Sequence, residues 1–123
     1  MTKEAEASDA AGFERIELEF EDSSDNGLPK KKAFRGKWIL APEDPVRLPG
    51  SAAMETDSRA YSVAVTAKGN IVVYMWKYVA EYDYGYRFLV FPSFEKAAQD
   101  IEINYAIREA VRKRGVPVEE LDI

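Results

Sequence analysis

The chain has 123 residues, 46% of them hydrophobic and 32% charged, which is the balance of one folded soluble domain. It contains no cysteine and no histidine, so disulfides, thiolate nucleophiles, Cys/His zinc sites and histidine-dependent catalytic arrangements are excluded. The net charge is −5, from 22 acidic and 17 basic residues, which argues against nucleic acid as a partner.

Residues 1–12 are small and acidic and cannot bury enough apolar surface to offset the entropy of ordering, so we expect a disordered N-terminal tail. Residues 13–123 are expected to form a single domain. The chain shows neither the apolar segment of a signal peptide nor a run of about 20 apolar residues that could cross a bilayer. A cytoplasmic protein is therefore the expectation.

Two strands are predicted at the start of the domain. Apolar and acidic residues alternate over residues 14–21, which indicates a strand with one buried face. Asn26 and Gly27 suit a turn with positive φ, and a second strand is predicted over residues 33–40. One face of this second strand is expected to carry Phe34, Gly36, Trp38 and Leu40. Residues 41–59, rich in proline and small residues, are predicted to be one long loop.

The next segment has the pattern of a β-hairpin, with strands over residues 61–67 and 70–78. A two-residue turn at Lys68 and Gly69 would oppose Val65 to Val72, Val63 to Tyr74, and Tyr61 to Trp76. A bulged three-residue turn would shift the register by one and oppose small residues to large ones. We predict the first register because it assembles the larger apolar face.

A fifth strand is predicted over residues 86–91, followed by a helical segment with Ser93 as its N-cap. The apolar pattern resets near Asp100, so this segment is either one kinked helix or two short helices with Asp100 capping the second. Gly115 is a suitable helix end. Strands followed by helix predict an α+β fold: an antiparallel sheet of about five strands with one kinked or two short C-terminal helices packed on one face.

The chain ends Pro117-Val-Glu-Glu-Leu-Asp-Ile123. This ending resembles that of the EXLDI proteins, small bacterial proteins named for a terminal Glu-x-Leu-Asp-Ile. The four fixed positions are matched by Glu119, Leu121, Asp122 and Ile123. The resemblance covers about the last third of the chain, and it implies no activity, substrate or catalytic residue.

Residues 116–123 are predicted to form an extended tail in which Leu121 and Ile123 point to one side. Chain termini are normally frayed unless something holds them. These two side chains either close an open edge of the domain's own core, or the tail and its carboxylate dock into a partner. Both alternatives stay open at this point.

Six of the seven tyrosines lie between residues 61 and 86. Tyrosine combines a large apolar area with a polar tip and is favoured at interfaces and ligand sites. These side chains either pack between sheet and helix, or they form a ligand cleft or protein interface centred on residues 82–86. The candidate contacts in that segment are Tyr82, Tyr84 and Tyr86.

A basic cluster consists of Lys30, Lys31, Lys32, Arg35 and Lys37. It could contact nucleic acid through phosphates, with Trp38 as a stacking platform. Alternatively, it is a charged edge strand that resists aggregation.

Catalytic candidates are few: Glu81, Asp83 and Arg87 flank the tyrosine segment, but their spacing does not require catalysis. We therefore expect a non-enzymatic protein-interaction or regulatory module without cofactor or metal, acting on a protein partner or by self-association. One alternative is a small-molecule-binding domain that uses a tyrosine-rich sheet face, with residues 41–59 closing over it. The second alternative is a nucleic-acid-associated regulator that uses the basic cluster.

Overall fold

The computed structural model of the protein describes residues 12–22, 26–49, 57–79 and 82–123. Some strand residues are described by their backbone alone: Asp22, Leu48, Pro49, Asp57, Ser58, Tyr78, Val79, Tyr82, Asp83, Tyr84 and Tyr86. The predicted disordered tail lies, apart from Gly12, outside the described residues.

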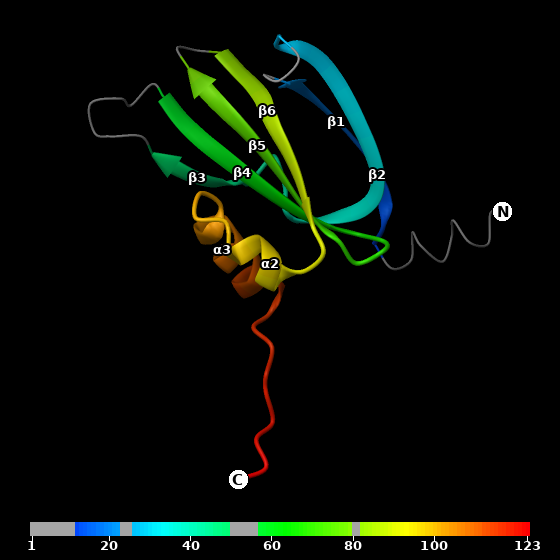
Figure 1. Ribbon diagram of the computed structural model, residues 1–123, viewed down its shortest axis with the longest axis vertical. Coiled ribbons are helices and arrows are strands. Elements are labelled where there is room, and N and C mark those ends of the chain that lie inside the picture. Colours follow the sequence, from blue (N-terminus) through cyan, green and yellow to red (C-terminus); the bar gives the residue numbers. More distant parts are fainter. Residues whose placement is uncertain (1–11, 23–25, 50–56, 80–81) are drawn as a thin grey trace, which may run out of the picture.

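The described chain has the predicted α+β architecture, an antiparallel sheet with two short helices (Figure 1). The strands are β1 (Glu14–Asp22), β2 (Leu28–Leu40), β3 (Val46–Pro49), β4 (Asp57–Thr66), β5 (Ile71–Val79) and β6 (Tyr82–Phe91). The helices are α2 (Phe94–Ala98) and α3 (Asn104–Arg114). The strand order is β1-β2-β4-β5-β6, and β3 pairs with β4 beyond the end of β2. Neither described helix is long and apolar enough to cross a membrane.

The two helices cover one face of the sheet and enclose the main core (Figure 1). The strands contribute Leu40, Tyr61, Val63, Val65, Ile71, Val73 and Met75 to this core. The helical segment contributes Ala97, Ile103, Ala106, Ile107 and Ala110. Small alanines on the helices let them approach the sheet closely, so the large side chains of β4 and β5 fill the space between the layers.

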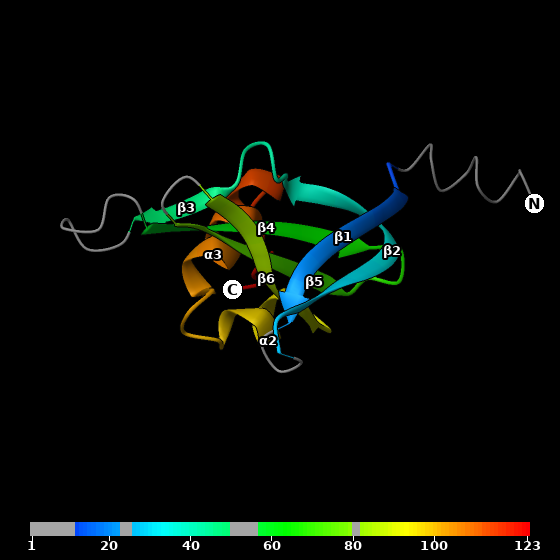
Figure 2. The ribbon, with the colours of Figure 1, turned by 90° about the horizontal axis from the view of Figure 1, so that it is seen from above.

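On the opposite face, which we call the inner face, the β1–β2 hairpin curls over the sheet (Figures 1 and 2). Phe20 of β1 stacks on Phe88 of β6 with ring centroids 6.0 Å apart, and Phe34 of β2 meets Phe88 edge-on at 5.9 Å. The two end strands of the sheet are therefore held together by side chains. Ile16 and Phe20 are buried as a result.

The predicted register of the β4–β5 hairpin is wrong by one residue. Val65 lies opposite Ile71, Val63 opposite Val73 and Tyr61 opposite Met75. The turn has three residues, 67–69, and ends on Gly69 with φ +91°, the geometry of a bulged three-residue hairpin.

The observed register is explained by what packs on each face of the sheet. The observed register places the large residues of both strands together under the helices. On the inner face, it sets Ala60, Ser62 and Ala64 of β4 opposite Trp76, Tyr74 and Val72. The pairing of small with large residues, which we expected to be unfavourable, makes room there for the β1–β2 hairpin.

The second correction concerns β2 and the segment after it. Trp38 lies opposite Ala64 while Leu40 lies opposite Val63, so β2 holds one extra residue between them. This β-bulge turns Leu40 into the helix-side core, away from the face of Phe34. The predicted loop 41–59 contains strand β3, whose Val46 packs against the same core, and its last three residues, 57–59, belong to β4.

The predicted N-cap is confirmed: Ser93 Oγ accepts a hydrogen bond from Lys96 N at 3.1 Å. The segment forms two helices, but Asp100 does not cap the second one, whose N-cap is Ile103. Asp100 Oδ1 instead accepts a hydrogen bond from Glu102 N at 3.0 Å in the turn between the helices. Gly115 ends α3 with φ +120°, as predicted.

Candidate functional site

The C-terminal tail, residues 116–123, runs away from the domain below the helices (Figure 1). Val118 is 80% exposed, Leu121 is 64% exposed and Ile123 is fully exposed. The alternative that Leu121 and Ile123 close the domain's own core is therefore wrong. Glu119 and Asp122, the other two motif positions, are exposed beside them. Recognition of this tail by a partner stays a prediction.

An apolar groove of about 740 Å³ lies between α2, α3 and the start of the tail. Phe94, Ala98, Ile107 and Val111 give it apolar walls, and Val116 and Pro117 form the side from which the tail leaves. Its cationic lining residues are Arg108, Arg112 and Arg114, and the Arg114 guanidinium lies 5.4 Å from the Phe94 ring centroid. Sequence reasoning missed this groove. Its signal was the basic run at the end of α3, which also suits the negative end of a helix dipole.

The predicted tyrosine site cannot be assembled from the described side chains. Tyr82, Tyr84 and Tyr86 belong to β6, but their side chains lie outside the described residues. Tyr61 and Tyr74, in contrast, are described on opposite faces: Tyr61 is buried under the helices, and Tyr74 crosses the inner face. These two tyrosines therefore do not share one tyrosine-rich sheet face.

Tyr74 has a structural partner. Its hydroxyl donates a hydrogen bond to the backbone oxygen of Glu19 in β1 at 2.7 Å. Burial, with a smaller effect from the Glu19 carboxylate, raises the pKa of Tyr74 above its ordinary value of 10.0. The hydroxyl therefore stays protonated at neutral pH and acts as a hydrogen-bond donor that ties β1 to the rest of the sheet.

The basic cluster divides between the two faces of β2. On the inner face, the Lys32 ammonium lies over the rings of Phe20 and Phe88, 5.6 Å and 5.1 Å from their centroids. The Lys37 ammonium lies over Phe13, whose backbone oxygen accepts a hydrogen bond from Arg35 at 3.3 Å. Because side chains alternate along a strand, Lys30 falls on the Lys32 side and Lys31 on the Arg35 side. The five cations thus do not form one continuous patch for a phosphate backbone.

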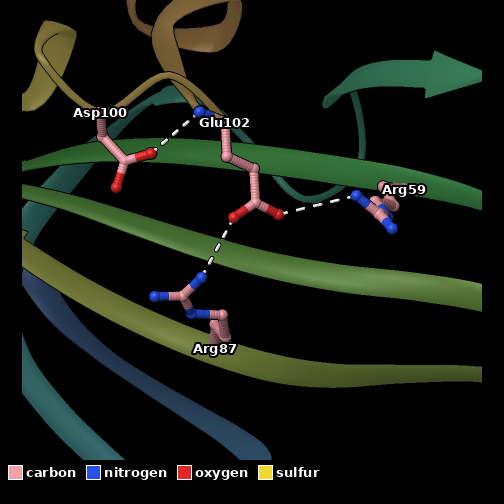
Figure 3. Close-up of polar contacts among 4 residues, drawn as sticks. All are labelled: Arg59, Arg87, Asp100 and Glu102. Atoms are coloured by element: carbon pink, nitrogen blue, oxygen red, sulfur yellow. Dashed lines mark hydrogen bonds and ion pairs between the residues drawn. The ribbon is translucent and has the colours of Figure 1, made fainter.

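A charged group that the sequence did not indicate joins the helical segment to the sheet (Figure 3). The Glu102 carboxylate lies 3.1 Å from Arg87 of β6 and 3.7 Å from Arg59 of β4. These residues are far apart in the chain, and only the packing of the α2–α3 turn on the sheet brings them together. By pairing with both guanidinium groups, the Glu102 carboxylate ties the α2–α3 turn to β4 and β6.

Of the catalytic candidates, Glu81 and the side chain of Asp83 lie outside the described residues, and Arg87 pairs with Glu102. Among the described residues, no three acidic side chains are grouped closely enough to hold a metal ion. Comparisons of the chain with protein-family models, with curated proteins and with solved structures found no match.

Proposed function

We propose that the protein is a non-enzymatic protein-interaction module whose C-terminal tail is the recognition element, and that a second copy of the chain accepts this tail. Two observations on the same chain carry the proposal: the tail has exposed apolar side chains, and the groove has apolar walls with arginines among its lining residues. Exposed apolar surface of this kind marks interaction sites. The likeness of the tail to the EXLDI ending is consistent with a motif that has a role of its own.

The tail and the groove are complementary in charge as well as in polarity. Glu119, Glu120 and Asp122 give the tail three negative charges between its apolar residues. In the part of the chain that the structure describes, the charged residues that line the groove are Glu95, Arg108, Arg112 and Arg114, a net charge of +2. Opposite charges around an apolar centre orient two partners and accelerate their association.

The acceptor is a second copy because the chain's own tail leaves from the wall of the groove. Val116 and Pro117 already form part of that wall, and the tail then runs away from the helices (Figure 1). A twofold axis beside the groove would place each tail in the groove of the other copy, which gives a closed, self-complementary dimer.

Sedimentation equilibrium over a range of protein concentrations tests the proposal. We expect the full chain to dimerise, and a version ending at Val118 and the variant Leu121→Asp to be monomers. Ile101→Asp is the matched control, because Ile101 is 93% exposed but lies in the α2–α3 turn. Circular dichroism must show that all four proteins fold alike.

Charge reversal tests the groove itself. Arg108→Glu with Arg112→Glu should weaken dimerisation at least about tenfold, and adding Glu119→Arg with Glu120→Arg should restore it. A full chain that stays monomeric at every concentration would contradict self-association. Capture of partners from a lysate by the full chain and by the version ending at Val118 then tests the wider proposal, which fails if both lengths capture the same proteins.

A further inference from the structure

A second groove opens where β2 separates from β4. Strand β2 pairs with β4 only from Gly36 to Leu40, whereas its N-terminal half pairs with β1. The last backbone link is a 2.8 Å hydrogen bond from Ala67 N in the β4–β5 turn to Arg35 O. Beyond this link lies an open groove of about 670 Å³ between β2, the turn and the adjoining parts of β5 and β6. We call it the mouth groove.

The floor of the mouth groove is apolar and partly aromatic. Phe34, Val72, Phe88 and Val90 line it, and the rings of Phe34 and Phe88 meet edge-on. Val90 is 54% exposed although it lies within a strand. A flat apolar group placed here would cover Val90 and contact the aromatic rings.

The charged residues that line the mouth groove are all cationic: Lys32, Arg35 and Lys68. None of the described lining residues is acidic, in a chain whose net charge is −5. The Arg35 guanidinium already donates to the Phe13 backbone oxygen, so Lys32 and Lys68 are the partners for a bound anion. The Lys32 ammonium lies 5.1 Å from the Phe88 centroid, directly beside the apolar floor.

We infer that the mouth groove binds a small organic anion with a flat apolar body, in which the ring system contacts Phe88 and Val90 and the anionic group contacts Lys32 and Lys68. The volume lies within the range of small-molecule sites, roughly 300–1,000 Å³. A carboxylate and a phosphate both suit the two ammonium groups. The site is separate from the tail and its groove, so this inference does not depend on the proposed function.

Fluorescence titration with two matched dyes tests the inference. Anilinonaphthalene sulfonate has a flat apolar body with an anionic group, and phenylnaphthylamine has the same rings without the charge. The sulfonate dye should bind the full chain more tightly than the neutral dye. The double variant Lys32→Gln, Lys68→Gln should weaken sulfonate binding about five- to tenfold and change neutral-dye binding less than about twofold.

The control variant Lys96→Gln, Lys113→Gln removes the same charge from the helices and should bind both dyes as tightly as the native chain does. Val90→Asp places a negative charge on the exposed floor of the groove and should also weaken binding of the sulfonate dye. Competition with naphthoate and with naphthyl phosphate then identifies the preferred anionic group, whereas inorganic phosphate alone should not compete. The inference is overturned if the sulfonate dye does not bind, if the Lys32→Gln, Lys68→Gln variant binds it as tightly as the native chain, or if neither naphthyl anion displaces it.

Discussion

Gly85 is the position at which the ring of Tyr74 passes across β6. A Cβ atom on residue 85 would overlap the Tyr74 hydroxyl and lie 2.7 Å from its Cζ atom. The substitution Gly85→Ala therefore displaces the ring, and the ring's hydroxyl loses its hydrogen bond to Glu19 of β1. A methyl group at this one position is expected to loosen the attachment of β1 to the sheet.

The size of the effect follows from three contributions. Forcing a methyl group into a packed site costs about 1–3 kcal/mol. Loss of the hydrogen bond from Tyr74 to Glu19 costs about 1 kcal/mol. Replacing glycine by alanine within a strand returns about 0.5–1 kcal/mol, because the unfolded chain loses conformational freedom. We expect Gly85→Ala to lower the free energy of unfolding by about 1–3 kcal/mol.

Urea denaturation followed by tryptophan fluorescence measures this change in three backgrounds. In the native chain, Gly85→Ala should destabilise as stated. In a Tyr74→Phe background it should still destabilise, since the ring atom Cζ remains in the way. In a Tyr74→Val background the obstructing ring is gone, and the same substitution should become neutral or stabilise by about 0.5–1 kcal/mol. Equal costs of Gly85→Ala in the Val and native backgrounds would refute the steric argument.

Three further predictions concern stability. The pKa of Tyr74 is raised in the folded state, so the contribution of its protonated hydroxyl to stability is complete below pH 10 and is lost as the pH rises through the raised pKa. The free energy of unfolding should therefore fall above pH 10, and this fall should be shallower in Tyr74→Phe. Glu102→Gln removes the ion pairs to Arg59 and Arg87, which are partly exposed, so melting should show a loss below about 1 kcal/mol that shrinks in high salt. Ser93→Ala removes the N-cap of α2 and should cost about 1 kcal/mol in urea denaturation, whereas Ser93→Thr should retain most of the stability.

The sequence predicted the fold class because its local signals agree with one another. Alternating residues in β1, the turn at Asn26 and Gly27, and the N-cap at Ser93 each act over a few residues and survive in the structure. The register of β4 on β5 depends instead on what covers each face. Small residues of β4 face large ones of β5 on the side that the β1–β2 hairpin covers, and the position of this hairpin is a long-range feature of the fold (Figure 2).

The candidate sites were predictable to a smaller extent. The tail was identified from its residues, but its exposure follows from the direction in which α3 ends. The grouping of Glu102 with Arg59 and Arg87 depends on strand order, and the mouth groove depends on the divergence of β2 from β4. No short-range pattern in the chain encodes either of these arrangements.

The attachment of β2 to β4 has a consequence for how the molecule opens. The β1–β2 hairpin is paired along its whole length, yet it joins β4 through the short segment that begins at Gly36, which lies opposite both Glu14 and Thr66. Its other links to the sheet are the hydrogen bond from Tyr74 to Glu19 and the contacts of Phe20 and Phe34 with Phe88. Tyr74 and Glu19 are 55 positions apart in the chain, and contacts over such separations form slowly during folding. We expect the hairpin to form a separate unfolding unit that swings about Gly36 while the helix-side core stays intact. In native-state hydrogen exchange, the amides of β1 would then exchange well before those of β4 and β5.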